Sequence, residues 1–203
     1  MTDSMPSSVF ALHELAEVVL ASASPRRRDL FALAGIPFTV IPAEHEEPWD
    51  HALSPDEAII RVARAKATWV RRQLPEDDHR CIVACDTAVL LDDHVFGKPK
   101  DRDDAAQMIH MLSGCTHQVK SGVCILAPSA SHTFVETTEV TFHPLTDRDI
   151  EAYLDCDEYR DKAGAYGIQG RGSLLVSRIT GDYLNVVGLP LARLARVLIE
   201  VCR

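Results

Sequence analysis

Residues 18–28, VVLASASPRRR, decide how this chain of 203 residues begins to fold. The apolar run at 18–20 predicts a strand, and the amphipathic segment at 29–34 predicts a helix after it. Ser24 and Pro25 stand where the N-cap and the first residue of that helix belong, and both residue types favour those positions. We therefore expect a strand that turns directly into a helix.

The same turn is a candidate site for an anion. A helix N-terminus presents unpaired backbone N–H groups and the positive end of the helix dipole. Two hydroxyl groups, on Ser22 and Ser24, and two guanidinium groups, on Arg26 and Arg27, stand beside it and suit phosphate. The alternative is a capped helix with solvated arginines, and this segment alone supports both interpretations about equally.

The overall composition favours a globular protein that binds a small anion. The chain has 21 Lys and Arg against 30 Asp and Glu, so its formal net charge is −9. This balance argues against a general binder of nucleic acid or of anionic membranes. The sequence shows neither a signal-peptide pattern nor an apolar run of membrane-spanning length, and we expect a cytoplasmic protein. Its six cysteines form no CxxC pair, so we expect them to be reduced and packed.

Signals for strands and helices follow one another along the rest of the chain. Helices are expected to begin after caps or prolines at Ser54, Asp101, Thr146 and Pro190, and strands to lie at 38–41, 81–91, 118–126, 133–142 and 174–179. Because the two kinds of element mix without strict βαβ alternation, the expected fold class is α/β with a mixed sheet. Residues 1–17 are expected to be an N-terminal extension with a short helix near 10–16, and residues 18–203 a single domain.

Asp86 is the sharpest catalytic candidate. It interrupts an almost wholly apolar run at 81–91, where Thr87 is its one polar neighbour. A carboxylate in such a run is costly unless it is paired, bound to a metal or protonated. We expect Asp86 to bind Mg²⁺ or to act as a general base. The alternative is a hydrogen-bonded Asp at the end of a strand.

Two lysines and an acidic loop could serve the same chemistry. Lys66 shares a stripe with apolar residues on a predicted helix, so it either reaches the edge of the core or points into a cleft. Lys98 follows a predicted hairpin and suits phosphate, although a solvated lysine is the default interpretation. Glu44, Glu46 and Glu47 could supply a second metal-binding carboxylate or form a solvated acidic loop.

The segment at 163–172, AGAYGIQGRG, is rich in glycine but matches neither the dinucleotide-binding fingerprint nor a P-loop. Its glycines allow the backbone to approach a ligand closely, and the amide of Gln169 could read the edge of a base. The alternative is an ordinary glycine-rich turn. Together, a cationic anchor, a carboxylate, two lysines and this loop suit the hydrolysis of a nucleoside polyphosphate.

Several of these motifs, in this order, resemble the Maf family of nucleotide pyrophosphatases. The matching segments are LASASPRRRDL at 20–30, AKA at 65–67, ACDT at 84–87, GKP at 97–99, LSG at 112–114, KAGAYGIQG at 162–170 and VVGLPL at 186–191. The resemblance implies an elongated mixed sheet with flanking helices in two lobes around a cleft, like that of inosine triphosphate pyrophosphatases. It also implies hydrolysis of a nucleoside triphosphate to the monophosphate and pyrophosphate with a divalent cation, Mg²⁺ or Mn²⁺.

The resemblance carries roles over to particular residues. It implies that Asp86 is the proton acceptor and that the segment from Ser22 to Arg27 binds phosphate. Glu47, Lys66 and Lys98 fall where the family places polar active-site residues. Asp86 and Glu47 are the metal ligands expected on this basis.

Three residues bear on the substrate. Arg26, Thr87 and Gln169 are similar to the family group that acts on dTTP and UTP, with modified pyrimidine nucleotides as further candidates. A relative that prefers 7-methyl-GTP has Trp after the proline and Gln after the aspartate. The alternatives are a purine or 7-methyl-GTP pyrophosphatase on the same fold, and a nucleotide-sensing regulator of cell division without turnover. The family also implies a homodimer.

Overall fold

A computed structural model describes residues 8–44, 47–128 and 130–202, and in it the chain divides into two compact units. The first unit consists of residues 1–86, 121–135 and 188–203, and the second of residues 87–120 and 136–187. Three long strands contribute residues to both units: β3 (Ile82–Leu91), β5 (Thr116–Leu126) and β6 (Ser131–Phe142).

The strands form a mixed sheet, which confirms the predicted α/β class. Its order is β2-β1-β3-β5-β6-β7, and β4 pairs with β3 off this path. The shorter strands are β1 (Val18–Leu20), β2 (Phe38–Val40), β4 (His94–Phe96) and β7 (Val176–Thr180). Strand β1 is parallel to β2 and β3, whereas β3 with β4 and β6 with β7 are antiparallel.

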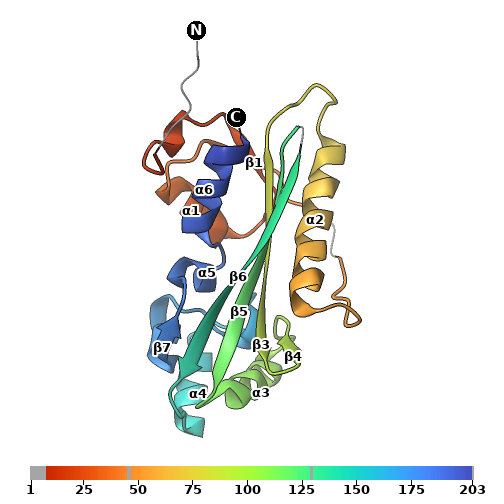
Figure 1. Cartoon of the computed structure of the whole chain (residues 1–203). Coiled ribbons are helices and arrows are strands. Elements are labelled where there is room, and N and C mark those ends of the chain that lie inside the picture. Colours follow the sequence, from red (N-terminus) through yellow and green to blue (C-terminus); the bar gives the residue numbers. More distant parts are fainter. Residues whose placement is uncertain (1–7, 45–46, 129, 203) are drawn as a thin grey trace. The chain divides into compact units, whose positions relative to one another are not determined.

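In the first unit, helices cover both sides of the strands (Figure 1). Helix α2 (Pro55–Gln73) lies on one side, and α1 (Pro25–Leu33) and α6 (Leu191–Val201) lie on the other. The face of α2 that meets the sheet is built from small and branched residues. The buried cluster that these helix residues form with the strands comprises Val19, Ala21, Ala63, Ala67, Val70, Ile82, Ala84 and Cys124. Lys66 lies in the middle of this 19-residue helix and meets Asp86 of β3.

The second unit has its own apolar core. Its helices are α3 (Arg102–Leu112), α4 (Asp147–Leu154) and α5 (Tyr183–Val187), with the 3₁₀ helices η2 (Ala163–Ala165) and η3 (Gly170–Leu175). Large side chains of the core include Phe96, Ile109, Leu112, Phe142, Ile150 and Leu154. Helix α5 was not expected from the sequence. The strand expected from residue 174 begins at Val176, because the 3₁₀ helix η3 takes up Leu174 and Leu175.

Helix starts follow the predicted capping residues. Ser54 accepts a hydrogen bond from the backbone N–H of Glu57, whose side chain accepts from the N–H of Ser54 in return. Thr146 and Asp149 repeat this arrangement at the start of α4. Such reciprocal caps satisfy two otherwise unpaired N–H groups at each helix start, which is why the sequence signal for them is dependable.

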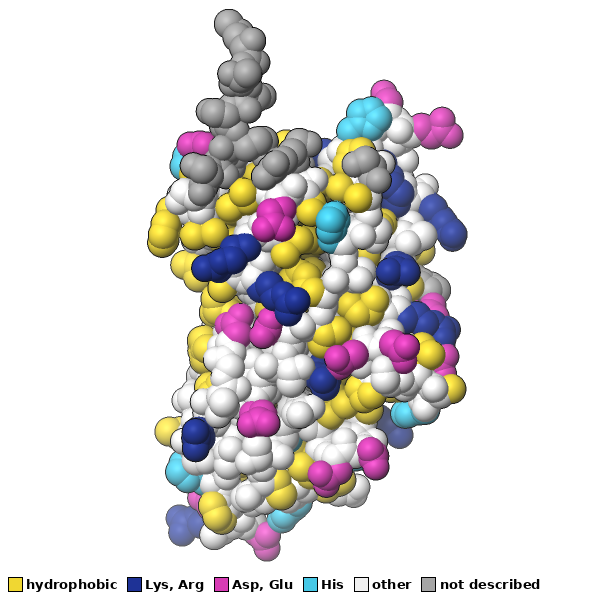
Figure 2. All heavy atoms as spheres, viewed as in Figure 1, with side chains coloured by type: hydrophobic (Ala, Val, Ile, Leu, Met, Phe, Trp, Pro, Cys, Tyr) yellow, Lys and Arg dark blue, Asp and Glu magenta, His cyan; other side chains and the backbone are white. Residues whose placement is uncertain are grey.

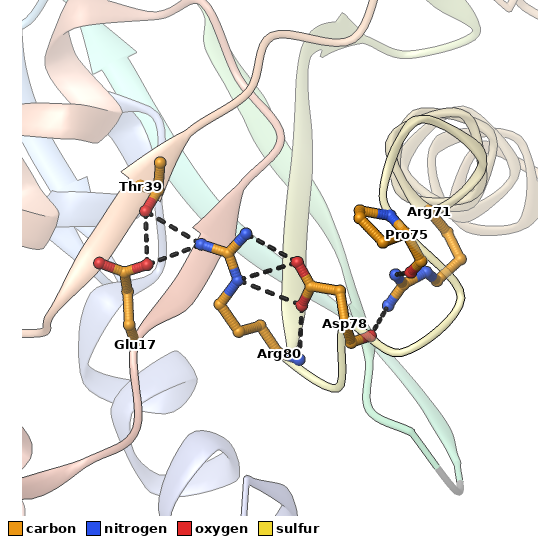
Figure 3. Close-up of polar contacts among 6 residues, drawn as sticks. All are labelled: Glu17, Thr39, Arg71, Pro75, Asp78 and Arg80. Atoms are coloured by element: carbon orange, nitrogen blue, oxygen red, sulfur yellow. Dashed lines mark hydrogen bonds and ion pairs between the residues drawn. The ribbon is translucent and has the colours of Figure 1, made fainter.

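Arg80 ties the edge of the first unit together (Figure 3). Its guanidinium group lies between Glu17, at 2.6 Å from Oε1, and Asp78, at 2.7 Å from Oδ2, and it also donates to Thr39 on β2. Hydrogen bonds from Arg80 hold the pKa of Asp78 down at about 2. The residue that precedes β1 and the loop that precedes β3 are thereby joined.

The N-terminal segment is packed at its described end. The short helix expected near 10–16 is a three-residue 3₁₀ helix, η1 (Leu12–Glu14). The side chains of Leu12 and Leu15 are buried. Residues 1–7 lie outside the described part, and the boundary predicted at residue 17 stays a prediction.

Two cysteines correct the prediction that all six are reduced. Cys81, just before β3, and Cys202, just after α6, form a disulfide across 121 residues of sequence. Cys85, Cys115, Cys124 and Cys156 are not in disulfides. The sequence could not indicate this pair, because the two cysteines meet only through the packing of α6 in the first unit.

The disulfide predicts a definite thiol count. Protein unfolded in denaturant without reductant should expose four titratable thiols, and six after reduction. Closing a loop of this length lowers the entropy of the unfolded chain, so reduction should cost roughly 4 kcal/mol of stability. Ellman titration and denaturant unfolding with and without reductant measure both effects. Six thiols without reductant would contradict the pairing.

The surface carries charges of both signs. On the face drawn in Figure 2, acidic and basic side chains of the described residues are interspersed. Within the described residues, no helix combines the length and the apolar character needed to cross a bilayer. The expectation that nucleic acid is not a partner stays a prediction.

Candidate active site

The turn from β1 into α1 is built around the buried hydroxyl group of Ser22. Its Oγ accepts hydrogen bonds from the backbone N–H of Ser24, at 3.2 Å, and from Nη1 of Arg27, at 3.3 Å. Arg27 also donates from Nε to the carbonyl oxygen of Gly188, at 2.8 Å. Ser22 and Arg27 therefore fix the turn and connect it to the segment before α6.

Ser24 and Arg26 occupy the start of α1 in a different way. Ser24 is the N-cap in an extended conformation and Pro25 is the first helical residue, as predicted. The Ser24 side chain makes no capping hydrogen bond, and both Ser24 and Arg26 are half-buried. Of the four predicted phosphate ligands, these two stand at the first turn of α1.

Asp86 and Lys66 form an ion pair within the first unit. Lys66 reaches from α2, and its Nζ contacts Oδ1 of Asp86, which lies midway along β3. The two side chains are 21% and 25% exposed, so the pair is partly shielded from water but open to a ligand. Both sequence signals are explained: the carboxylate in an apolar strand is paired, and the lysine on an apolar helix stripe is its partner.

Glu47 is held elsewhere. Its Oε1 accepts from Nε of Arg61, at 2.8 Å, and from Nη2, at 2.5 Å, and Arg61 also pairs with Asp50. Arg61 and Lys66 are five residues apart on α2, which places them about 140° apart around the helix axis. The structure therefore joins Glu47 and Asp86 to different faces of α2. Glu46 lies outside the described residues.

These carboxylates bear on the expected metal ion. Among the described residues, no group of three or more His, Cys, Asp or Glu side chains is placed to hold a metal. The described donor set therefore does not amount to a metal cage made by protein alone. It fits a Mg²⁺ or Mn²⁺ ion that arrives with phosphates and takes one carboxylate from the protein, as Mg²⁺ often does.

In the second unit, the structure brings the Lys98 segment to the glycine-rich segment. Thr87 follows Asp86 on β3 and is half-buried. Lys98 is exposed just after β4, and the carbonyl oxygen of the preceding Gly97 accepts from the N–H of Gly164, at 3.1 Å. Gln169 is exposed in the same glycine-rich segment.

Buried aromatic residues hold the start of this glycine-rich segment. A hydrogen bond of 2.7 Å joins Nε2 of His117 to the hydroxyl group of Tyr166, and both rings pack edge-on against Phe142. Burial lowers the pKa of His117 to about 4, so the imidazole is neutral at pH 7. The hydroxyl group of Tyr153 accepts from the N–H of Gly167, at 3.4 Å. His117 and Tyr153 thus support the backbone of this segment, and no sequence signal marked either residue for that role.

The chain matches the Maf-like protein family over residues 17–201. It belongs to the Maf family. A Bacillus velezensis relative named dTTP/UTP pyrophosphatase is 46% identical over 183 residues, which are 90% of this Maf chain and 95% of the relative. A Bacillus anthracis relative with the same name is 45% identical over 90% of this chain and 94% of its own length. The Ham1 protein of Staphylococcus aureus matches 64% of this chain and 73% of its own, at 15% identity and a TM-score of 0.38.

Proposed function

We propose that this Maf protein hydrolyses dTTP and UTP to the monophosphate and pyrophosphate. The observation that carries the proposal is the half-buried Lys66–Asp86 pair, in a chain about 45% identical over 90% of its length to relatives named dTTP/UTP pyrophosphatase. Such a pair gives a carboxylate of fixed orientation beside a cation, as water activation near phosphates requires.

Asp86 is the general base in this proposal. Its ion pair uses Oδ1, so Oδ2 can accept a proton from a water molecule. The water oxygen attacks the α-phosphorus, the bond from that phosphorus to the bridging oxygen breaks, and pyrophosphate leaves. Lys66 orients the carboxylate and places positive charge where negative charge develops.

Some of the predicted phosphate ligands contact phosphate, and others hold the turn that binds it. Ser24, Arg26 and the first turn of α1 bind phosphate oxygens, because a helix start with a hydroxyl and a guanidinium group suits an anion. Ser22 and Arg27 hold that turn in place through their contacts with each other and with Gly188. In the second unit, the exposed Lys98 is a further phosphate ligand.

A divalent cation, Mg²⁺ or Mn²⁺, is part of the proposal. Asp86 would be the protein residue that holds the cation, together with phosphate oxygens of the substrate and water. When bound, the cation neutralises phosphate charge and polarises the phosphorus–oxygen bonds. Glu47, which is held by Arg61, is assigned to supporting the loop beside α2 rather than to direct ligation.

Thr87 and Gln169 are assigned to the nucleoside. The amide of Gln169 offers one acceptor and two donor hydrogens, which can pair with the carbonyl and N–H groups at the edge of uracil or thymine. Thr87 adjoins the general base in sequence and bears on which nucleotide is accepted. Replacing Gln169 should therefore change substrate preference more than stability.

Pyrophosphate release from a nucleotide panel tests the function. We expect turnover of dTTP and UTP with Mg²⁺ or Mn²⁺, little turnover of CTP, ITP, GTP or 7-methyl-GTP, and loss of activity with chelator. Turnover of purine nucleotides alone would overturn the substrate assignment. Tight nucleotide binding without hydrolysis would identify a nucleotide sensor instead.

A homodimer and a cytoplasmic location complete the proposal. Sedimentation of the purified chain measures whether it is a dimer. Disulfides are uncommon in reducing compartments, so we expect Cys81 and Cys202 to be reduced in a cytoplasmic protein. Blocking thiols when cells are lysed preserves this redox state for measurement.

A further inference from the structure

The segment from Gly167 to Gly172 closes on itself and presents Gln169 at its tip. A Cβ atom on Gly172 would lie 2.0 Å from the carbonyl oxygen of Gly167, so the two ends of the segment are in direct contact. Ile168 is buried at 5% exposure, while the next residue, Gln169, is exposed. We call residues 167–172 the specificity loop.

The carboxylate of Glu158 closes one end of the specificity loop. Oε1 accepts from the backbone N–H of Arg171, at 3.0 Å, and Oε2 accepts from that of Gly172, at 3.1 Å. Gly170 makes room for the carboxylate, because a Cβ atom there would lie 2.7 Å from Oε1. Gly170 also has a φ of +65°, which glycine adopts at little cost.

Glu158 is itself held in place. It lies in the turn after α4, and its carbonyl oxygen accepts a hydrogen bond from Nζ of Lys162. The stem of Lys162 packs so close to Gly167 that a Cβ atom there would lie 2.7 Å from Cε. The opposite end of the specificity loop is fixed by Tyr153, which accepts from the N–H of Gly167. The two ends thus have separate supports. Tyr153 supports one end with a neutral hydroxyl group, whereas Glu158 supports the other with a carboxylate that accepts from two consecutive N–H groups.

We infer that Glu158 is a positioning residue for substrate selection: its carboxylate fixes the specificity loop in the conformation that presents Gln169 to the pyrimidine. This inference rests on the proposed function of Gln169. Hydrogen bonds from N–H groups to a carboxylate are stronger than those between neutral groups, so they are suited to holding an exposed loop rigid. We call the two bonds from Arg171 and Gly172 to Glu158 the clamp. Glu158 itself touches neither phosphate nor base in this role.

Two substitutions at Glu158 remove the acceptors of the clamp to different extents. Glu158→Ala removes both acceptors, whereas Glu158→Gln keeps one oxygen and replaces the other with an NH₂ group that cannot accept. For Glu158→Ala we expect the preference for dTTP over CTP in kcat/KM to fall about tenfold, mainly through a higher KM for dTTP. Glu158→Gln should lie between wild type and Glu158→Ala. Asp157→Asn is the matched control, because Asp157 contacts Arg160 and should leave both constants unchanged.

Hydrogen exchange reports on the clamp without any turnover. In Glu158→Ala, the amides of Arg171 and Gly172 should exchange at least about tenfold faster than in wild type, while core amides on β5 keep their protection. Unchanged exchange at these two amides would overturn the inference. Equal losses in kcat for every nucleotide, with KM unchanged, would also overturn it, because they would place Glu158 in the chemical step.

Gln169→Ala in the same assays separates the two proposals. If it lowers the preference for dTTP and Glu158→Ala does not, the positioning role is wrong and the proposed function stands. If wild type discriminates between dTTP and CTP but neither variant changes this, Gln169 does not read the base and the inference fails with it. If wild type releases no pyrophosphate, the proposed function fails, and the inference fails with it whatever hydrogen exchange shows of the clamp.

Discussion

Asp86→Asn is expected to lower kcat for dTTP by about a thousandfold while leaving the chain folded. A general base contributes on the order of 10²–10⁴ to a rate, and an amide cannot take up the proton from water. The change is nearly isosteric and breaks one ion pair whose members are 21% and 25% exposed. Stability should therefore fall by about 1 kcal/mol. Pyrophosphate release at saturating dTTP and thermal unfolding measure the two effects.

Asp50→Asn provides the matched control for this experiment. Asp50 is also a partly exposed carboxylate paired with a cation of α2, in its case Arg61. The substitution should cost similar stability and leave most of the turnover. If Asp86→Asn keeps more than about a tenth of wild-type activity, Asp86 is neither the base nor the cation ligand, and Lys66 would need another explanation.

The sequence predicted those features whose cause is local. The reciprocal caps at Ser54 and Thr146 depend on residues three positions apart, and both are present. The hairpin predicted before Lys98 is present as the antiparallel pair β3 and β4, with Leu91 opposite His94. Within four residues the side chain and its backbone partner are neighbours by geometry, so composition and spacing suffice.

Features with distant partners were predicted less well. Asp86 was expected to be paired, bound to a metal or protonated, and Lys66 to reach the edge of the core or a cleft. Nothing in the sequence indicated that the two pair across 20 residues. The contact of Glu47 with Arg61 depends on how the loop meets α2, so no local pattern predicted it. The disulfide between Cys81 and Cys202 is the extreme case. Such pairings follow from the packing of whole elements, which no short window of sequence contains.

The glycine-rich segment shows both outcomes. Its glycines do allow a close approach between two parts of the backbone, since Gly172 meets the carbonyl oxygen of Gly167. The predicted approach to a ligand stays a prediction. The prediction of a strand from residue 174 was wrong by two residues, because the 3₁₀ helix η3 continues to Leu175 before β7 begins. Local propensity is a weak guide where backbone N–H groups donate to a side chain distant in sequence, as those of Arg171 and Gly172 do to Glu158.

Gly122→Ala should cause a large loss of stability in the first unit. Gly122 lies on β5 where α2 crosses it, and a Cβ atom there would lie 2.7 Å from the carbonyl oxygen of Ile59 and 2.8 Å from its carbonyl carbon. Backbone atoms of a 19-residue helix cannot move aside singly, so α2 would have to shift as a whole. Overpacking of this kind costs about 3 kcal/mol, which corresponds to a fall in Tm of roughly 6–12 °C for a chain of this size.

The same shift should reach the active site, because α2 carries Lys66. We expect kcat for dTTP to fall several-fold in Gly122→Ala at temperatures where the protein is still folded, since the partner of Asp86 moves. Gly97→Ala is the stability control: no atom lies within 4 Å of a Cβ atom built there. Calorimetry of both variants at one fixed redox state decides the matter. A fall in Tm of less than about 2 °C for Gly122→Ala would mean that α2 does not rest on β5 at this glycine, and the placement of Lys66 beside Asp86 would lose its structural support.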